Sequence, residues 1–202
     1  MKMYKKVMAA ALAGVMTVSM SATAFAADDD GYILKATNED SKSSDNDLVI
    51  AIEGSVSSMD PANIPDTNAI SATRGVYETL VSFDENQELT GKLAESWEVS
   101  DDSLTYTFKL RQGVKFQDGT DFNAAAVKAN YDRVVNKDNN LRQRRTFIVT
   151  NEDGSETPRV DSIETPDDYT LVIKLTQAWA PFINRLTQFC IISPAALEEY
   201  GN

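Results

Sequence analysis

Two stretches of the chain alternate between apolar and polar residues, which is the pattern of a β-strand with one buried face. The first, LTYTFKL at residues 104–110, follows SWEVS at residues 96–100, with the turn residues DDS between them. The second, YTLVIKL at residues 169–175, follows RVDSIETP at residues 159–166 across Asp167 and Asp168. Each pair of segments predicts a β-hairpin.

A third apolar run, LVIAIEG at residues 48–54, is short, rich in Val and Ile and ended by glycine. It therefore predicts a strand that is buried on both faces. The polar loop SVSSMDPANIPDTNA follows at residues 55–69, and Pro61 and Pro65 prevent it from continuing the strand or forming a helix. A strand, a long loop and a helix in this order place loop backbone at the mouth of a cleft.

Helical spacing of apolar residues predicts three helices, and hence a mixed α/β fold. The first begins near Asn68, and its apolar face consists of Ile70, Val76, Tyr77, Leu80 and Val81. The second follows the N-cap residue Asn123, and its apolar face consists of Val127, Tyr131, Val134 and Val135. The third has Ser193 as N-cap, Pro194 at its first position and Gly201 at its end. Before the second helix, QDGT at residues 117–120 predicts a tight turn with Gly119 at positive φ.

The composition narrows the function classes. With 202 residues, 42% hydrophobic and 25% charged, the chain can build one large domain or two small ones. Its net charge of −12 would repel a phosphate backbone, which excludes nucleic acid as a partner. The chain contains no histidine, so it has no Ser-His-Asp triad and lacks the ligand of most zinc sites. The single cysteine, Cys190, lies among apolar neighbours, and we expect a buried, inert thiol.

The N-terminus has the features of an export signal. Residues 1–26 contain three early lysines, an uncharged run and the sequence AFA before three aspartates, which predicts a secretory signal peptide cleaved after Ala26 or Ala24. A membrane anchor is the alternative, but no stop-transfer flank follows the run. Residues 27–47 are mostly Asp, Asn, Ser and Lys and predict a flexible acidic linker. We therefore expect a periplasmic or extracellular protein whose ordered domain is residues 48–202.

The order of four segments resembles the N-terminal part of the family 5 extracellular solute-binding proteins, which are receptors of ABC importers for peptides, glutathione and nickel. These segments are YETLVSFD, LAESWEVSDDSLTYTFKLRQGVKFQDGTDFNAAAV, PFINRLTQF and ISPAAL. The resemblance covers residues 48–202, and the tryptophan hairpin with LRQGVKFQDGT is its most specific part. It implies the N-terminal lobe of a periplasmic-binding-protein-like fold (type II, cluster C), truncated, with a β-hairpin subdomain. The resemblance also implies that Trp97, Tyr106 and Phe108 of that subdomain are packing residues.

The chain also departs from the family pattern. Ala126 stands where an acidic residue is common, which puts a polar or capping contact in doubt, and Gln117 stands where many members have histidine. Members are roughly twice as long or more, and a glycine-rich GTGP segment does not follow ISPAAL. The resemblance therefore implies that the second lobe and the return strands of the first are missing.

The resemblance places the loop at residues 55–69 in the cleft between the lobes. Small hydroxyl and amide side chains there can hydrogen-bond a peptide backbone or another polar solute, and the predicted lining set is Ser57, Ser58, Asp66, Thr67 and Asn68. The alternative is a solvated turn in which Asp60 and Asp66 close Asx turns around the two prolines.

The implied function is capture of a peptide or similar small polar solute without chemistry. A receptor of this family closes on its solute by hinge motion and delivers it to a membrane permease driven by ATPase subunits. We expect a monomer with no catalytic residue, no cofactor and no metal. Because the chain supplies one lobe at most, we also expect weak or absent solute binding by the chain alone.

Two other classes compete with this hypothesis. Asp118 and Asp121 in FQDGTDF lie close in sequence and suggest a hydrolase with paired carboxylates or a calcium loop. Turn formation explains both aspartates, so we expect no enzyme. The other alternative is a secreted interaction domain without a small-molecule ligand, which would expose an apolar patch and have no cleft.

Overall fold

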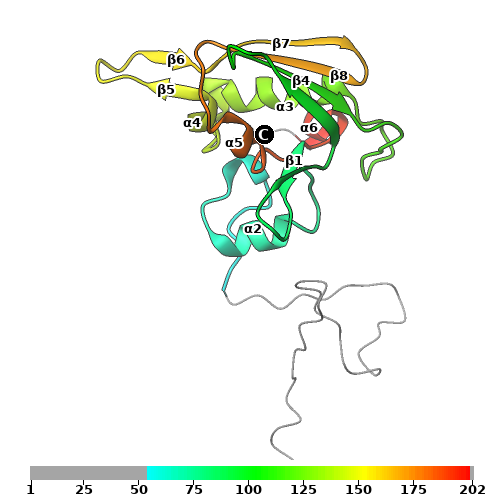
Figure 1. The fold of residues 1–202 in the computed structure, drawn as a ribbon. Helices are drawn as coiled ribbons and strands as arrows, with labels where there is room; N and C mark the ends of the chain where they lie inside the picture. Colours follow the sequence, from blue (N-terminus) through cyan, green and yellow to red (C-terminus); the bar gives the residue numbers. More distant parts are fainter. Residues whose placement is uncertain (1–53, 201–202) are drawn as a thin grey trace, which may run out of the picture. The chain divides into compact units, whose positions relative to one another are not determined.

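A four-stranded antiparallel sheet organises the computed structural model, which describes residues 54–200. Its strands, in the order β3-β4-β8-β7, are β3 (Ala94–Val99), β4 (Thr105–Leu110), β8 (Thr170–Leu175) and β7 (Val160–Asp167). Figure 1 shows the sheet with helix α3 (Ala124–Val135) beneath it. Both predicted hairpins are confirmed, and pairing of β4 with β8 joins them into one sheet.

Three predictions fall outside the described residues. They are the signal peptide at residues 1–26, the linker at residues 27–47 and the strand at residues 48–54, of which only Gly54 is described. These three assignments stay predictions.

The core lies on the face of the sheet that the sequence alternation predicts. Tyr106, Phe108 and Leu110 of β4 are buried, as are Leu171, Ile173 and Leu175 of β8. The register places Phe108 opposite Leu171, and the ring of Tyr106 packs edge-on against Phe182, 4.9 Å between centroids. Trp97 is partly buried against the same cluster. The burial of Tyr106 and Phe108 and the partial burial of Trp97 confirm that these aromatic residues are packing residues. Each fully buried side chain of this size stabilises the fold by about 1.5–3 kcal/mol.

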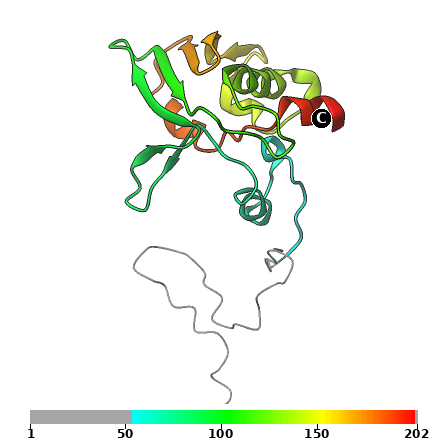
Figure 2. The same ribbon diagram turned by 90° about the vertical axis from the view of Figure 1, so that its right-hand side faces the viewer.

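Helix α3 covers this face of the sheet, as Figures 1 and 2 show from two directions. Its N-cap is confirmed, because the N–H of Ala126 donates to Asn123 Oδ1 at 2.9 Å. Val127 and Val134 are buried, and Tyr131 and Val135 are partly buried, as predicted. At Ala126, where the family resemblance leads one to expect an acid, the small side chain is buried and the backbone N–H is already capped.

The first predicted helix is correct at its start and wrong in its length. Helix α2 (Thr67–Thr73) ends after seven residues, and the apolar Val76 beyond it is 44% exposed. Leu80 and Val81 are buried, but outside any helix. The chain bends at Leu80, and Val81 begins β1 (Val81–Phe83), which pairs with β2 (Leu89–Gly91). The cause is long-range bonding. Thr79 bridges to Cys190, and the carbonyl of Leu80 accepts from Lys92 and Ala94, both at 3.0 Å.

The remaining elements are short. They are the 3-10 helices η2 (Pro61–Asn63) and η3 (Lys137–Asn139), the helices α4 (Arg144–Phe147), α5 (Phe182–Leu186) and α6 (Pro194–Tyr200), and the strands β5 (Ile148–Thr150) and β6 (Glu156–Pro158). The start of α6 is as predicted, with the N–H of Ala196 donating to Ser193 Oγ at 3.3 Å. The predicted turn is also confirmed, because Gly119 has φ +85°. The predicted stop at Gly201 lies outside the described residues.

Candidate functional site

The loop before α2 is built around two aspartate caps. The N–H of Ala62 donates to Asp60 Oδ1 at 3.0 Å, which caps η2. The N–H of Ala69 donates to Asp66 Oδ1 at 2.8 Å, which caps α2. Both aspartates therefore close local turns beside the two prolines, as the simpler of the two hypotheses for this loop predicts.

The five predicted lining residues lie on this loop and the start of α2. Ser57 Oγ donates to Asp66 Oδ2 at 2.6 Å, and this bond, followed by the bond from Ala69, lowers the pKa of Asp66. Ser58 Oγ accepts from the N–H of Asp60 at 3.1 Å. The structure thus brings Ser57 and Asp66 into contact and turns Ser58 toward the other aspartate.

Thr67 and Asn68 lie at the beginning of α2. Thr67 is exposed, and its carbonyl accepts from Ser71 Oγ at 3.0 Å. Asn68 is half-buried against Gly54, where a Cβ would stand 2.6 Å from Asn68 Nδ2. Gly54 has φ +107°, a backbone conformation that favours glycine. The loop start and the helix start are therefore in close contact.

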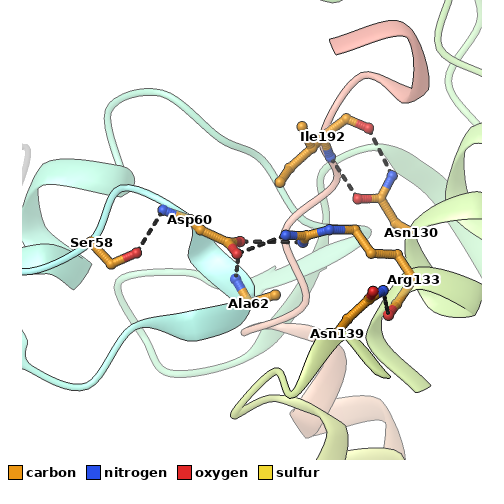
Figure 3. Close-up of polar contacts among 7 residues, drawn as sticks. All are labelled: Ser58, Asp60, Ala62, Asn130, Arg133, Asn139 and Ile192. Atoms are coloured by element: carbon orange, nitrogen blue, oxygen red, sulfur yellow. Dashed lines mark hydrogen bonds and ion pairs between the residues drawn. The ribbon is translucent and has the colours of Figure 1, made fainter. Parts of the chain in front are cut away.

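An ion pair between Asp60 and Arg133 attaches this loop to helix α3. The two side chains meet at two points, Nη2 to Oδ2 at 2.7 Å and Nη1 to Oδ1 at 3.2 Å. Figure 3 shows the carboxylate lying between the η2 backbone and the guanidinium. The side chain of Arg133 is 8% exposed and that of Asp60 27%, so water screens the pair little. The same carboxylate that caps η2 therefore also ties the loop to α3.

A second side chain of α3 holds the C-terminal segment. Asn130 is buried, and its Nδ2 donates to the carbonyls of Ala126 at 2.9 Å and Ile192 at 2.7 Å. Its Oδ1 accepts from the N–H of Ile192 at 3.0 Å, so the amide pairs with that residue as a neighbouring strand would (Figure 3). Sequence analysis missed both contacts. The available signal was that Asn130 and Arg133 lie one turn apart on a helix, beside its apolar face.

A hollow of about 810 Å³ lies beside α2 and β1. Its walls come from four segments: residues 61–64, 70–92, 142–146 and 185–190. Two hydrogen bonds of Gln143 tie these walls together, from its N–H to the carbonyl of Ala62 at 3.0 Å and from Nε2 to the carbonyl of Gln188 at 2.7 Å. None of the five predicted lining residues borders this hollow, nor a smaller one of about 400 Å³ between α3 and α6.

Cys190 lies at the edge of the larger hollow and is half-buried, where full burial was predicted. Its backbone bridges to Thr79, which also borders the hollow. Burial raises the pKa of the thiol to about 11. The thiolate needed for nucleophilic attack is therefore scarce near neutral pH.

Asp118 and Asp121 have separate structural partners. Asp118 accepts from the backbone N–H and hydroxyl of Thr120, at 2.9 and 2.6 Å, and from Ser193 Oγ. Asp121 pairs with Lys115. Turn formation therefore explains Asp118 in part, and an ion pair rather than a turn bond accounts for Asp121. In residues 54–200 no group of three or more Cys, Asp or Glu side chains is placed to hold a metal ion, and no helix there has the length and apolarity to span a membrane.

Comparison with known proteins gives one consistent result. Residues 88–201 match the family described as "bacterial extracellular solute-binding proteins, family 5 Middle". The chain is 38% identical over 190 residues to the glutathione-binding protein GsiB of Escherichia coli (strain K12). The matched region covers 93% of this chain and 32% of that protein. It thus spans about a third of the length of the curated relatives it matches.

Solved structures agree with the sequence matches. The Escherichia coli murein tripeptide binding protein MppA superposes with a TM-score of 0.63 at 27% identity, over 73% of this chain and 31% of that one. The periplasmic binding protein DppA of Helicobacter pylori, in complex with the peptide STSA, superposes with a TM-score of 0.56 at 31% identity, over 71% of this chain and 30% of that one.

Proposed function

The chain belongs to the family 5 bacterial extracellular solute-binding proteins, and we propose that it acts in the substrate-binding component of an ABC importer. The expected resemblance and the periplasmic-binding-protein fold are confirmed by the matches above. In the proposed role the protein captures a peptide or similar small polar solute and delivers it to the membrane permease and its ATPase subunits. The observation that carries the proposal is the family match over residues 88–201.

The relatives support capture without chemistry, because GsiB, MppA and DppA are all described as binding proteins. We propose accordingly that the chain is not an enzyme. The separate partners of Asp118 and Asp121 support the same conclusion. Hydrogen bonds from Ser193 and Thr120 lower the pKa of Asp118, whereas a general acid needs a raised one, and Asp121 is paired with Lys115.

The proposed solute-contacting surface is the loop that α3 and the two caps hold, with Ser57, Ser58, Asp66, Thr67 and Asn68 as its lining residues. A loop that is already fixed loses little conformational entropy when a solute binds. The ion pair of Asp60 with Arg133 and the cap at Asp66 support this surface, because they set its backbone before any solute arrives.

Export is part of the proposal. Residues 1–26 act as a cleaved signal peptide, residues 27–47 as a flexible linker, and residues 48–202 as the solute-binding domain. The family description as extracellular and the description of DppA as periplasmic support a location outside the cytoplasm.

The experiment is isothermal titration of the purified chain with glutathione, a dipeptide and a tetrapeptide. Because the chain spans about a third of its relatives, we expect binding weaker than micromolar, and Thr67→Ala and Asn68→Ala should weaken it more than twofold. Thr90→Ala on β2, another exposed threonine, is the matched control. Absence of binding agrees with the expectation of weak or absent binding by the chain alone, whereas a solute whose binding neither loop variant weakens would refute the five lining residues. A micromolar dissociation constant for a peptide would refute the prediction that the chain supplies only one wall of the cleft.

A further inference from the structure

Cationic side chains gather around the larger hollow although the protein as a whole is strongly acidic. The cationic residues on its border are Arg74, Lys92, Arg142, Arg145 and Arg185. They outnumber the acidic residues on the border, Glu78 and Asp84. The net charge of the chain is −12, so a dissolved anion is repelled by most of the molecule and meets a positive field here.

None of these five cations forms an ion pair with another residue in the range 54–200. Every ion pair there uses a cation elsewhere, namely Lys115, Lys128, Arg133, Arg144 or Lys174. The hollow is therefore lined by cationic side chains that have no anionic partner within the described part of the chain. Such an arrangement favours an anion from outside.

Helix ends account for some of these cations. Arg74 follows the last residue of α2, Arg145 lies in α4, and Arg185 lies in the last turn of α5. A cation at a helix C-terminus is favoured by the helix dipole alone. Lys92 and Arg142 lie outside every helix, so the dipole does not explain them. These two residues are the ones that test a binding role.

The hollow is formed before any solute binds. Its walls are joined by the two hydrogen bonds of Gln143, by the bridge between Thr79 and Cys190, and by a bond from the N–H of Ile191 to the carbonyl of Glu78 at 3.0 Å. Its volume of about 810 Å³ lies within the range of about 300–1,000 Å³ that is common for small-molecule sites. A solute with several charged groups can therefore enter without rearranging the backbone.

We propose that this hollow binds a small solute carrying two or more anionic groups, either carboxylates or phosphates, through Lys92, Arg142 and the arginines around them. Several groups are required because the cations come from three separate chain segments, residues 74–92, 142–145 and 185, and cannot all meet one carboxylate. The site is distinct from the loop of the proposed function, whose five lining residues do not border the hollow.

The test is isothermal titration of the purified full chain with citrate and, separately, with inorganic pyrophosphate. At about 0.01 M ionic strength, where screening is weak, we expect a dissociation constant below about 1 mM for at least one of them. Lys92→Gln and Arg142→Gln should each weaken binding about two- to fivefold, as expected for the loss of one exposed ion pair. Lys137→Gln is the matched control, because it removes the same charge from an exposed residue outside the hollow.

Thermal unfolding of each variant without anion provides a second readout, and the three melting temperatures should agree with the parent within about 2 °C because none of these side chains is buried. Tighter citrate binding identifies carboxylates as the preferred groups, and tighter pyrophosphate binding identifies phosphates. Either result supports the site if the hollow variants weaken it and the control does not. No binding of either anion, or equal loss in Lys137→Gln, would overturn the proposal.

Discussion

Replacing Arg133 with alanine tests how firmly helix α3 holds the loop of the proposed site. The guanidinium meets the Asp60 carboxylate through two nitrogens, at 2.7 and 3.2 Å. The Asp60 side chain is only 27% exposed, so removing the guanidinium leaves a largely buried carboxylate without this partner. The substitution should therefore destabilise the fold, and the loop more than the sheet.

The expected loss of folding stability follows from the burial of the ion pair. Breaking a buried ion pair by removing one partner costs about 3–5 kcal/mol. Asp60 keeps some contact with water, which reduces the cost of its lost partner, so we expect about 2–4 kcal/mol for Arg133→Ala. Asp60→Ala should cost a similar amount and also removes the cap of η2, which is worth about 1 kcal/mol.

Urea denaturation of Arg133→Ala, Asp60→Ala and the double variant measures the pair itself. The double variant should be less destabilised than the sum of the single variants by about 1–3 kcal/mol. Lys128→Ala is the matched control, because its pair with Asp132 lies on the same helix with both side chains about half exposed, and it should cost only about 0.3–0.5 kcal/mol. A coupling energy below about 0.5 kcal/mol would refute the reasoning that this pair fastens the loop.

Three further predictions concern other polar groups. Asn130→Asp places a carboxylate against the carbonyls of Ala126 and Ile192 and should cost about 2–4 kcal/mol at pH 7 in urea denaturation; an unchanged midpoint would contradict this. Hydrogen bonds from Ser193 first and Thr120 second lower the pKa of Asp118 below its ordinary 3.8, so its stabilisation is complete above that pH and is lost as the pH falls through the folded value. Asp118→Asn should therefore flatten the acid limb of the stability profile, and a limb identical to the parent's would argue against the contact. With a pKa of about 11, Cys190 should react with iodoacetamide at pH 8 about 100-fold more slowly than in urea, and comparable rates would show that the thiol is not shielded.

The sequence predicted the parts of the fold that depend on neighbours in the chain. Both hairpins, the cap at Asn123 and the turn at Gly119 follow from alternation, capping and backbone preferences within a few residues. The structure contains each of them. The family resemblance also rests on such local stretches, because the tryptophan hairpin and the turn after it are contiguous in the sequence.

The incorrect helix shows where local information ends. Leu80 and Val81 fit a helical face as well as they fit a strand, and the choice between the two was made by distant residues. Cys190 bridges to Thr79, and Lys92 and Ala94 bond to Leu80. A backbone carbonyl that finds a partner in another segment no longer needs the one four residues along a helix.

The candidate site divides in the same way. The turns closed by Asp60 and Asp66 before α2 could be foreseen as one of two hypotheses for the loop, since capping acts over three residues. Folding of distant segments was needed to bring Arg133 to Asp60 across 73 residues and to place cations from three segments around one hollow. The reason is that a charge has no preferred partner along the sequence, whereas packing of the core decides which distant side chains share a surface.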